Sequence, residues 1–210
     1  LVETRWVAQT FTSRQEEVAI VAEQDRSLLD ATLDAVDIAR QGFQDSSPLV
    51  PALQVLPLAL ATVWEPLDVY ALLQFLSHPI GPVPSYASRR LAEVIAECPG
   101  IGGPRWREVI EKIERLYPER AVDIRNALAF WVEHPRYSPA HGTPLTVLLE
   151  RTRGVRDYFA ARFSDQDPIR SAASATGYAQ AIAVSAALEA LAAQGESSIT
   201  PVELEALVSQ

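Results

Sequence analysis

The sequence is poor in sulfur-containing side chains. Its 210 residues include one cysteine, Cys98, so an internal disulfide and a cysteine-based zinc site are both excluded. Methionine is absent, even at position 1, and we therefore expect an internal fragment of a longer protein. A secretory leader is not visible, and the longest apolar run, residues 50–63, is interrupted by Pro51, Gln54 and Pro57. We expect a cytoplasmic protein that makes no membrane contact.

Side chains that carry catalysis are also scarce. The three histidines, His78, His134 and His141, lie in proline-containing segments, and none has a carboxylate or second histidine at the helical spacing of metal ligands. A GxxxxGK[ST] phosphate loop does not occur, and no nucleophile lies in a recognisable elbow. The sequence therefore predicts no catalytic site, no metal and no cofactor in this fragment, and a stand-alone hydrolase would need a constellation that it lacks.

Acidic residues outnumber basic ones, and the net charge of −9 argues against a free-standing nucleic-acid binder. Residues 1–45 carry four arginines against nine acids and residues 163–210 one against six, whereas residues 46–162 hold thirteen basic and twelve acidic side chains. Any DNA contact therefore belongs to the middle of the chain. The alternative is that these arginines form solvated helix faces with i,i+4 partners such as Glu111 and Arg115.

Apolar periodicity predicts a mostly α-helical chain. Residues 18–22 are typical of a buried strand and residues 28–36 of a helix, which together suggest a small α/β piece over residues 1–45. Thr200, Pro201 and Glu203 have the spacing of a capping box. We expect no strand after residue 45. The predicted helices of residues 46–210 start near Pro48 and run to residue 63, then cover 69–76, 85–96, 104–116, 121–132, 144–163, 172–193 and 201–208. The apolar spacing places Leu91, Val94 and Ile95 on the inward face of the 85–96 helix, and Trp106, Val109, Ile110 and Ile113 on that of the 104–116 helix.

The segment CPGIGGPRW, residues 98–106, resembles the hairpin of a helix-hairpin-helix DNA-binding module. In that module glycines let backbone N–H groups approach one phosphate at the start of the second helix. Trp106 occupies the place of a small residue and would hold the helices apart, so a plain turn between core helices is the competing interpretation. The candidate DNA-binding residues are Arg89, Arg90, Gly100, Gly102 and Arg105.

A longer stretch resembles a known family. Residues 66–106, from "PLD" through "LLQFLSHPIGPVPSYASRRLAE" to "PGIGGPRW", are similar to the helicase-like part of AddB-type subunits, PD-(D/E)XK nuclease family proteins of bacterial double-strand-break repair. Residues 18–42 resemble the strand and helix of UvrD-like helicases. The resemblance implies that residues 1–45 are the edge of the second RecA-like domain and residues 46–210 the helical domain inserted into it. In UvrD-like enzymes that insertion touches duplex DNA.

The resemblance also implies a function. We expect a non-catalytic region that guides DNA or serves as a scaffold, in a parent exonuclease that has a helicase-like region and a partner subunit. Its nuclease acids would lie beyond residue 210. The prolines of Ile80-Gly81-Pro82-Val83-Pro84 depart from the family's GIG loop and remove N–H donors. The alternative is a helical interaction module that docks a partner subunit without touching DNA, through Trp64, Trp106 and Trp131.

Overall fold

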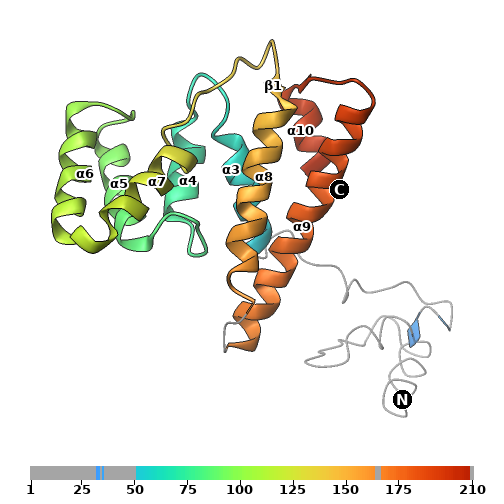
Figure 1. The fold of residues 1–210 in the computed structure, drawn as a ribbon, viewed down its shortest axis with the longest axis horizontal. Helices are drawn as coiled ribbons and strands as arrows, with labels where there is room; N and C mark the ends of the chain where they lie inside the picture. The colour runs from blue at the N-terminus through green and yellow to red at the C-terminus, as the bar shows by residue number, and fades with distance from the viewer. Residues whose placement is uncertain (1–31, 34, 36–50, 164–166, 209–210) are drawn as a thin grey trace, which may run out of the picture. The chain divides into compact units, whose positions relative to one another are not determined.

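Helix follows helix from Pro51 to Val208 in the computed structural model, which describes residues 32–33, 35, 51–163 and 167–208. The mostly α class predicted from the periodicity is confirmed. Of the α/β piece predicted for residues 1–45, only residues 32, 33 and 35 are described, and the rest lies outside the described residues. The predicted boundary at 45/46 also lies outside them. None of the described helices combines the length and apolar character needed to cross a bilayer. The elements in Figure 1 are α3 (Pro51–Ala61), α4 (Val69–Ser77), α5 (Ser85–Glu97), α6 (Pro104–Leu116), the 3-10 helix η1 (Pro118–Arg120), α7 (Ala121–Trp131), β1 (Thr143–Pro144), α8 (Leu145–Ala160), α9 (Pro168–Ala193), β2 (Ser198–Ile199) and α10 (Pro201–Val208).

Proline and capping residues set several helix starts. Helices α6 and α10 begin at Pro104 and Pro201, as predicted. In the capping box, the Thr200 N–H donates to the Glu203 carboxylate at 2.7 Å, which confirms that prediction. Helix α9 begins at Pro168 instead of residue 172, because proline is suited to the first helical turn. Helix α8 ends at Ala160 instead of residue 163.

Two short strands correct the expectation that no strand follows residue 45. β1 pairs with β2 in antiparallel register, with Thr143 opposite Ile199. Each strand has two residues, too few to show an alternating pattern in the sequence. They meet because α8 and α9 run antiparallel, which brings the start of one helix beside the end of the other (Figure 1). At Gly142, φ is +74° and an added Cβ would lie 2.8 Å from the Ile199 carbonyl oxygen, so this connection requires glycine.

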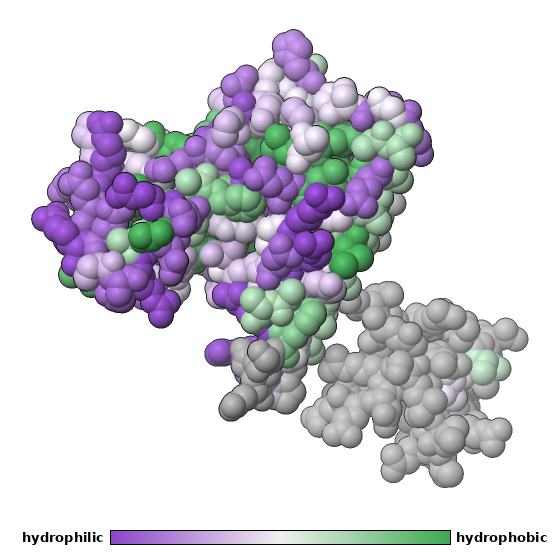
Figure 2. Space-filling model, viewed as in Figure 1, coloured by the Kyte–Doolittle hydropathy of each residue, from purple (hydrophilic) through white to green (hydrophobic). Residues whose placement is uncertain are grey.

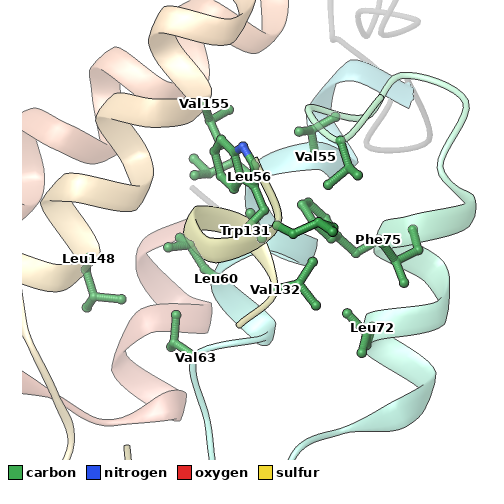
Figure 3. Close-up of a cluster of buried hydrophobic side chains, with 14 of the residues drawn as sticks. Val55, Leu56, Leu60, Val63, Leu72, Phe75, Trp131, Val132, Leu148 and Val155 are labelled. Carbon is green, nitrogen blue, oxygen red and sulfur yellow. The ribbon is translucent and has the colours of Figure 1, made fainter. Parts of the chain in front are cut away.

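The main core surrounds α3, whose sequence is apolar on nearly every face. Trp131, at the end of α7, lies in this core, with its ring centroid 6.1 Å from that of Phe75 on α4. Figure 3 shows Trp131 among side chains from α3, α4 and α8. This packing fixes the end of α7 against α8, which positions the loop that follows. The buried residues labelled there are Val55, Leu56, Leu60, Val63, Leu72, Phe75, Trp131, Val132, Leu148 and Val155.

Helices α5 and α6 lie on one side of the bundle, away from α8 and α9, whereas the end of α7 packs against α8 (Figure 1). Leu91, Val94 and Ile95 of α5 are buried, as predicted. On α6, Trp106 and Ile113 are buried, and the predicted inward residues Val109 and Ile110 are only partly buried. Tyr86 at the start of α5 stacks on Tyr117 just after α6, with ring centroids 4.4 Å apart, so the two helices are antiparallel. The turn of residues 98–103 therefore projects from the opposite end of the pair.

Candidate nucleic-acid interface

The turn between α5 and α6, residues 98–103, has backbone geometry that needs glycine. Gly100 has φ of +132° and Gly102 has φ of +75°, values that side-chain-bearing residues rarely adopt. Both glycines are exposed, and a Cβ added to either would meet no heavy atom within 4 Å. Glycine is therefore required here by the backbone and not by crowding. The result is an open turn whose main chain is accessible to a ligand.

The amino-terminal end of α6 follows this turn directly and lacks a side-chain cap. Gly103 is the N-cap residue with extended backbone, and Pro104 occupies the first helical position without an N–H. The Arg107 N–H donates to the Gly103 carbonyl at 3.1 Å. The N–H groups of Arg105 and Trp106 belong to the first turn and have no acceptor within the helix. This end can therefore donate to an anion, with the positive end of the helix dipole behind it.

Two of the three predicted arginines already have carboxylate partners. Arg105 Nη1 lies 2.9 Å from Glu108 Oε2, and Arg90 Nη1 lies 3.0 Å from Glu93 Oε2. The Glu108 carboxylate raises the pKa of Arg105 through this hydrogen bond and its charge. Both pairs are solvent-exposed and join residues three apart on one helix, where ion pairs are weak, so a phosphate can displace the carboxylates.

The five predicted residues do not form one site. Gly100, Gly102 and Arg105 share the turn and the start of α6. Arg89 and Arg90 lie in the first half of α5, and Arg89 precedes Cys98 by about 13 Å along the axis at 1.5 Å per residue. They sit near the end of the pair marked by Tyr86 and Tyr117 instead of near the turn. They cannot contact the same phosphate as the turn.

Arg107 is a cationic residue near the turn that is not among the predicted site residues. Its side chain is exposed, and among the described residues it takes part in no ion pair. It follows Arg105 by two positions, so the Arg105/Arg107 pairing in the sequence was the available signal. Lone cationic side chains beside open N–H donors are typical of phosphate contacts.

Trp106 is a packing residue. It is 1% exposed, and its indole Nε1–H donates to Glu133 Oε1 at 2.6 Å. Burial of the ring does not test whether a tryptophan at this position holds the two helices apart, which stays a prediction. The ring fills the core of this side of the bundle, and the carboxylate after α7 satisfies its polar atom.

The other tryptophans offered for partner docking are not surface anchors. Trp131 is 7% exposed, and Trp64 is partly buried and forms a backbone bridge with Tyr137. The most exposed large apolar or aromatic side chain reported among the described residues is Tyr70, at 80%. The tryptophans therefore give the docking alternative no support.

His134 is a buried histidine in the loop after α7. Its Nε2 lies 3.2 Å from Thr62 Oγ1 and its Nδ1 2.9 Å from the Pro135 carbonyl oxygen. Burial lowers its pKa to about 4, and the charges of Arg151 and Arg136 act in the same direction. The imidazole is neutral near pH 7, and Nδ1–H donates to the carbonyl. Across the described ranges, no three His, Cys, Asp or Glu side chains group as metal ligands.

Comparison with protein-family models, with curated proteins and with solved structures finds no match for this chain.

Proposed function

We propose that this chain is a helical, non-catalytic region of an AddB-like helicase–nuclease subunit, which guides or holds DNA during double-strand-break repair. In this proposal residues 46–210 are the insertion domain of a UvrD-like fold, and the parent is a PD-(D/E)XK exonuclease with a partner subunit. The observation that carries the proposal is the turn of residues 98–103. Its two positive-φ glycines are exposed and stand directly before the uncapped start of α6.

The contact would consist mainly of backbone N–H groups and nearby arginines on one phosphate. The N–H groups of Arg105 and Trp106 donate, while Arg107 adds a positive charge. Such contacts position DNA without reading its sequence. Because the chain is acidic overall, the affinity of the isolated chain should be low and should fall steeply with salt.

The test is fluorescence anisotropy of labelled duplex and single-stranded DNA at low salt. The double change Arg105→Ala and Arg107→Ala should weaken binding several-fold, whereas Arg89→Ala with Arg90→Ala should weaken it less. Glu108→Gln should strengthen binding, because it releases Arg105 from its carboxylate. Arg153→Ala is the matched control, since Arg153 of α8 is also an exposed arginine that forms an ion pair, with Glu189. Equal affinity of the Arg105/Arg107 variant and this control would remove the turn from DNA binding.

Partner docking without DNA contact is the second candidate function. Leu116 is 64% exposed and Val122 is 71% exposed, and the two flank η1. Apolar side chains at a surface can anchor a protein interface. Substitution of both by serine should weaken binding to the parent's partner subunit, measured by co-purification, while DNA binding stays unchanged. Retention of the partner by this variant would argue against docking at η1.

A further inference from the structure

The end of the α5–α6 pair opposite the turn carries two tyrosines in contact. The ring centroids of Tyr86 and Tyr117 lie 4.4 Å apart, and the ring planes are inclined by 37°. Tyr117 is 36% exposed, whereas Tyr86 is partly buried and packs against one side of the Tyr117 ring. The exposed ring is therefore already held in one orientation. Such a ring loses little conformational freedom when a ligand stacks on it.

Each tyrosine has an arginine one turn further along the chain. Arg89 follows Tyr86 by three positions in α5, and residues three apart are neighbours on a helix surface. The Arg120 N–H donates to the Tyr117 carbonyl at 3.0 Å, so a single 3-10 turn joins these two residues. Both arginines are exposed. Two aromatic rings and two cationic side chains thus share one end of the helix pair, which we call the Tyr86–Tyr117 platform.

Neither arginine of the platform is neutralised by an acid. Arg89 and Arg120 take part in none of the ion pairs found among the described residues. Glu93 lies four positions after Arg89, a spacing that favours an ion pair, but its carboxylate contacts Arg90 instead. Glu119 of η1 also lies at this end and repels phosphate, so the affinity should be modest and should fall as salt rises. Two positive charges remain available to an anionic ligand.

We propose that the Tyr86–Tyr117 platform binds single-stranded nucleic acid. Unpaired bases stack on exposed aromatic rings, and nearby arginines contact the phosphates that link the bases. A duplex keeps its bases inside the helix and can present one to Tyr117 only after unpairing it. The inference rests on the proposed DNA-holding function and adds a second contact to it. This contact gives Arg89 a role that the distant turn of residues 98–103 cannot give it.

A protein partner is the competing occupant of this end. Leu116, which is 64% exposed, directly precedes Tyr117, and Val122 follows η1. A protein interface would use the apolar area of these two side chains, whereas base stacking requires the aromatic ring itself. The two unpaired arginines favour nucleic acid, because phosphates supply negative charge at every nucleotide. The two occupants therefore respond to different substitutions.

The first test is the fluorescence anisotropy of the 210-residue chain with labelled oligo(dT) of about 16 nucleotides, and with a duplex of the same length, at low salt. Tyr117→Leu should weaken oligo(dT) binding about five-fold or more and leave duplex affinity unchanged, because leucine is apolar but has no aromatic face. Tyr70→Leu is the matched control, since Tyr70 is 80% exposed and has no arginine one turn away in sequence. Equal oligo(dT) affinity of the two variants would overturn the inference.

The arginines have a separate readout, the dependence of oligo(dT) affinity on salt. Arg89→Gln with Arg120→Gln should reduce the slope of log affinity against log salt by about 1.4, because each contact with a single-strand phosphate contributes about 0.7. Arg153→Gln with Arg170→Gln is the matched control and should keep the slope, since both arginines are exposed and paired with acids. The same slope in both double variants would contradict the phosphate contact.

Ultraviolet cross-linking of the unchanged chain keeps the inference testable if Tyr117→Leu does not fold. Peptide mass spectrometry should place an oligo(dT) adduct on Tyr117, and adducts confined to residues outside the platform would overturn it. Leu116→Ser with Val122→Ser should keep oligo(dT) affinity, whereas loss of affinity would indicate apolar docking instead of stacking.

The platform and the turn can fail separately. Arg105→Ala with Arg107→Ala removes the charges beside the turn and leaves the platform intact. If this variant loses duplex affinity while Tyr117→Leu keeps oligo(dT) affinity, the platform is overturned and the proposed function stands. The opposite pair of results would support the platform and remove the turn from DNA binding.

Discussion

Two antiparallel helix pairs, α5–α6 and α8–α9, use glycine for opposite purposes. In α5–α6 the glycines lie in an exposed turn, and the positive φ of Gly100 and Gly102 is what requires them. In α8–α9 they lie inside helices with ordinary backbone. A Cβ at Gly177 on α9 would collide with the Phe159 ring of α8, and one at Gly154 on α8 would lie 2.7 Å from the Phe130 ring of α7. The α5–α6 pair thus gains an open turn, whereas glycine lets α9 and α7 approach α8 closely.

The surfaces of the two helix pairs also differ in polarity. Figure 2 shows mainly hydrophilic side chains over α5 and α6, with more apolar area over α8 and α9. Ion pairs occur on both helix pairs, for example Arg105–Glu108 on α6 and Arg153–Glu189 between α8 and α9, but most of the exposed residues of α9 are alanines. The comparison teaches that helix pairs of similar topology can serve distinct roles. In the proposed function the polar turn makes the ligand contact, and the tightly packed pair provides rigidity.

The largest expected effect on stability comes from removing the buried Trp106 ring of α6. Trp106→Ala should destabilise the protein by about 3 to 5 kcal/mol, because it deletes a fully buried ring and leaves Glu133 without the indole N–H. Denaturant unfolding followed by circular dichroism measures this change. Trp106→Phe is the control and should cost less, since most of the volume remains. A cost below about 1 kcal/mol for Trp106→Ala would show that this side is loosely packed.

Acid should lower the free energy of unfolding through His134. His134 has a pKa of about 4 when folded and an ordinary value of 6.5 when unfolded, so between these values the unfolded chain binds more protons. The stability that the neutral His134 imidazole provides is fully present above pH 6.5. As the pH falls from 6.5 to 4, the free energy of unfolding should decrease by about 3 kcal/mol. The measurement is urea unfolding across this range for the unchanged chain and for His134→Gln, whose curve should be flatter. An imidazole pKa near 6.5 by NMR would contradict this.

The α8–α9 pair should reject a methyl group at its closest contact. Gly177→Ala should cost about 2 kcal/mol, although alanine favours helix by about 1 kcal/mol, because the new Cβ would meet the buried Phe159 ring. Thermal or urea unfolding detects this loss. Gly103→Ala makes the same chemical change at an exposed position with nothing within 4 Å, and it should cost less than about 1 kcal/mol. A stabilising Gly177→Ala would show that the helices can separate without penalty.

The smallest stability effect should come from the turn. Gly102→Ala should cost about 1 kcal/mol, because alanine is strained at φ of +75°. Gly102→Asn should recover part of the loss, since asparagine tolerates this conformation. The discriminating measurement is the fluorescence anisotropy of labelled DNA. Gly102→Ala should weaken DNA binding, whereas Gly103→Ala should not, because it does not distort the turn. Unchanged affinity in both variants would leave the turn a purely structural connection.

Periodicity predicted most of the helices and little of the site. Leu91, Val94 and Ile95 could be assigned to the core because their spacing alone places them on one helix face. The spacing of Thr200 and Glu203 likewise predicted their capping contact. The Glu108 partner of Arg105 is also local, three residues away on the same helix, but local spacing alone does not say which acid pairs. The distance of Arg89 from the turn follows from the length of the predicted helix, whereas the antiparallel packing of α5 and α6 was shown only by the contact between Tyr86 and Tyr117.

The sequence by itself determined the helical class, most helix limits and the glycine turn, because these depend on side-chain period, proline positions and local backbone preference. Tertiary structure decided what lies between the elements. It buried Trp131, paired β1 with β2, and left Arg151 without an ion pair among the residues that the structure describes. Those outcomes depend on contacts between residues far apart in the chain, and neither composition nor periodicity specifies which distant side chains will meet.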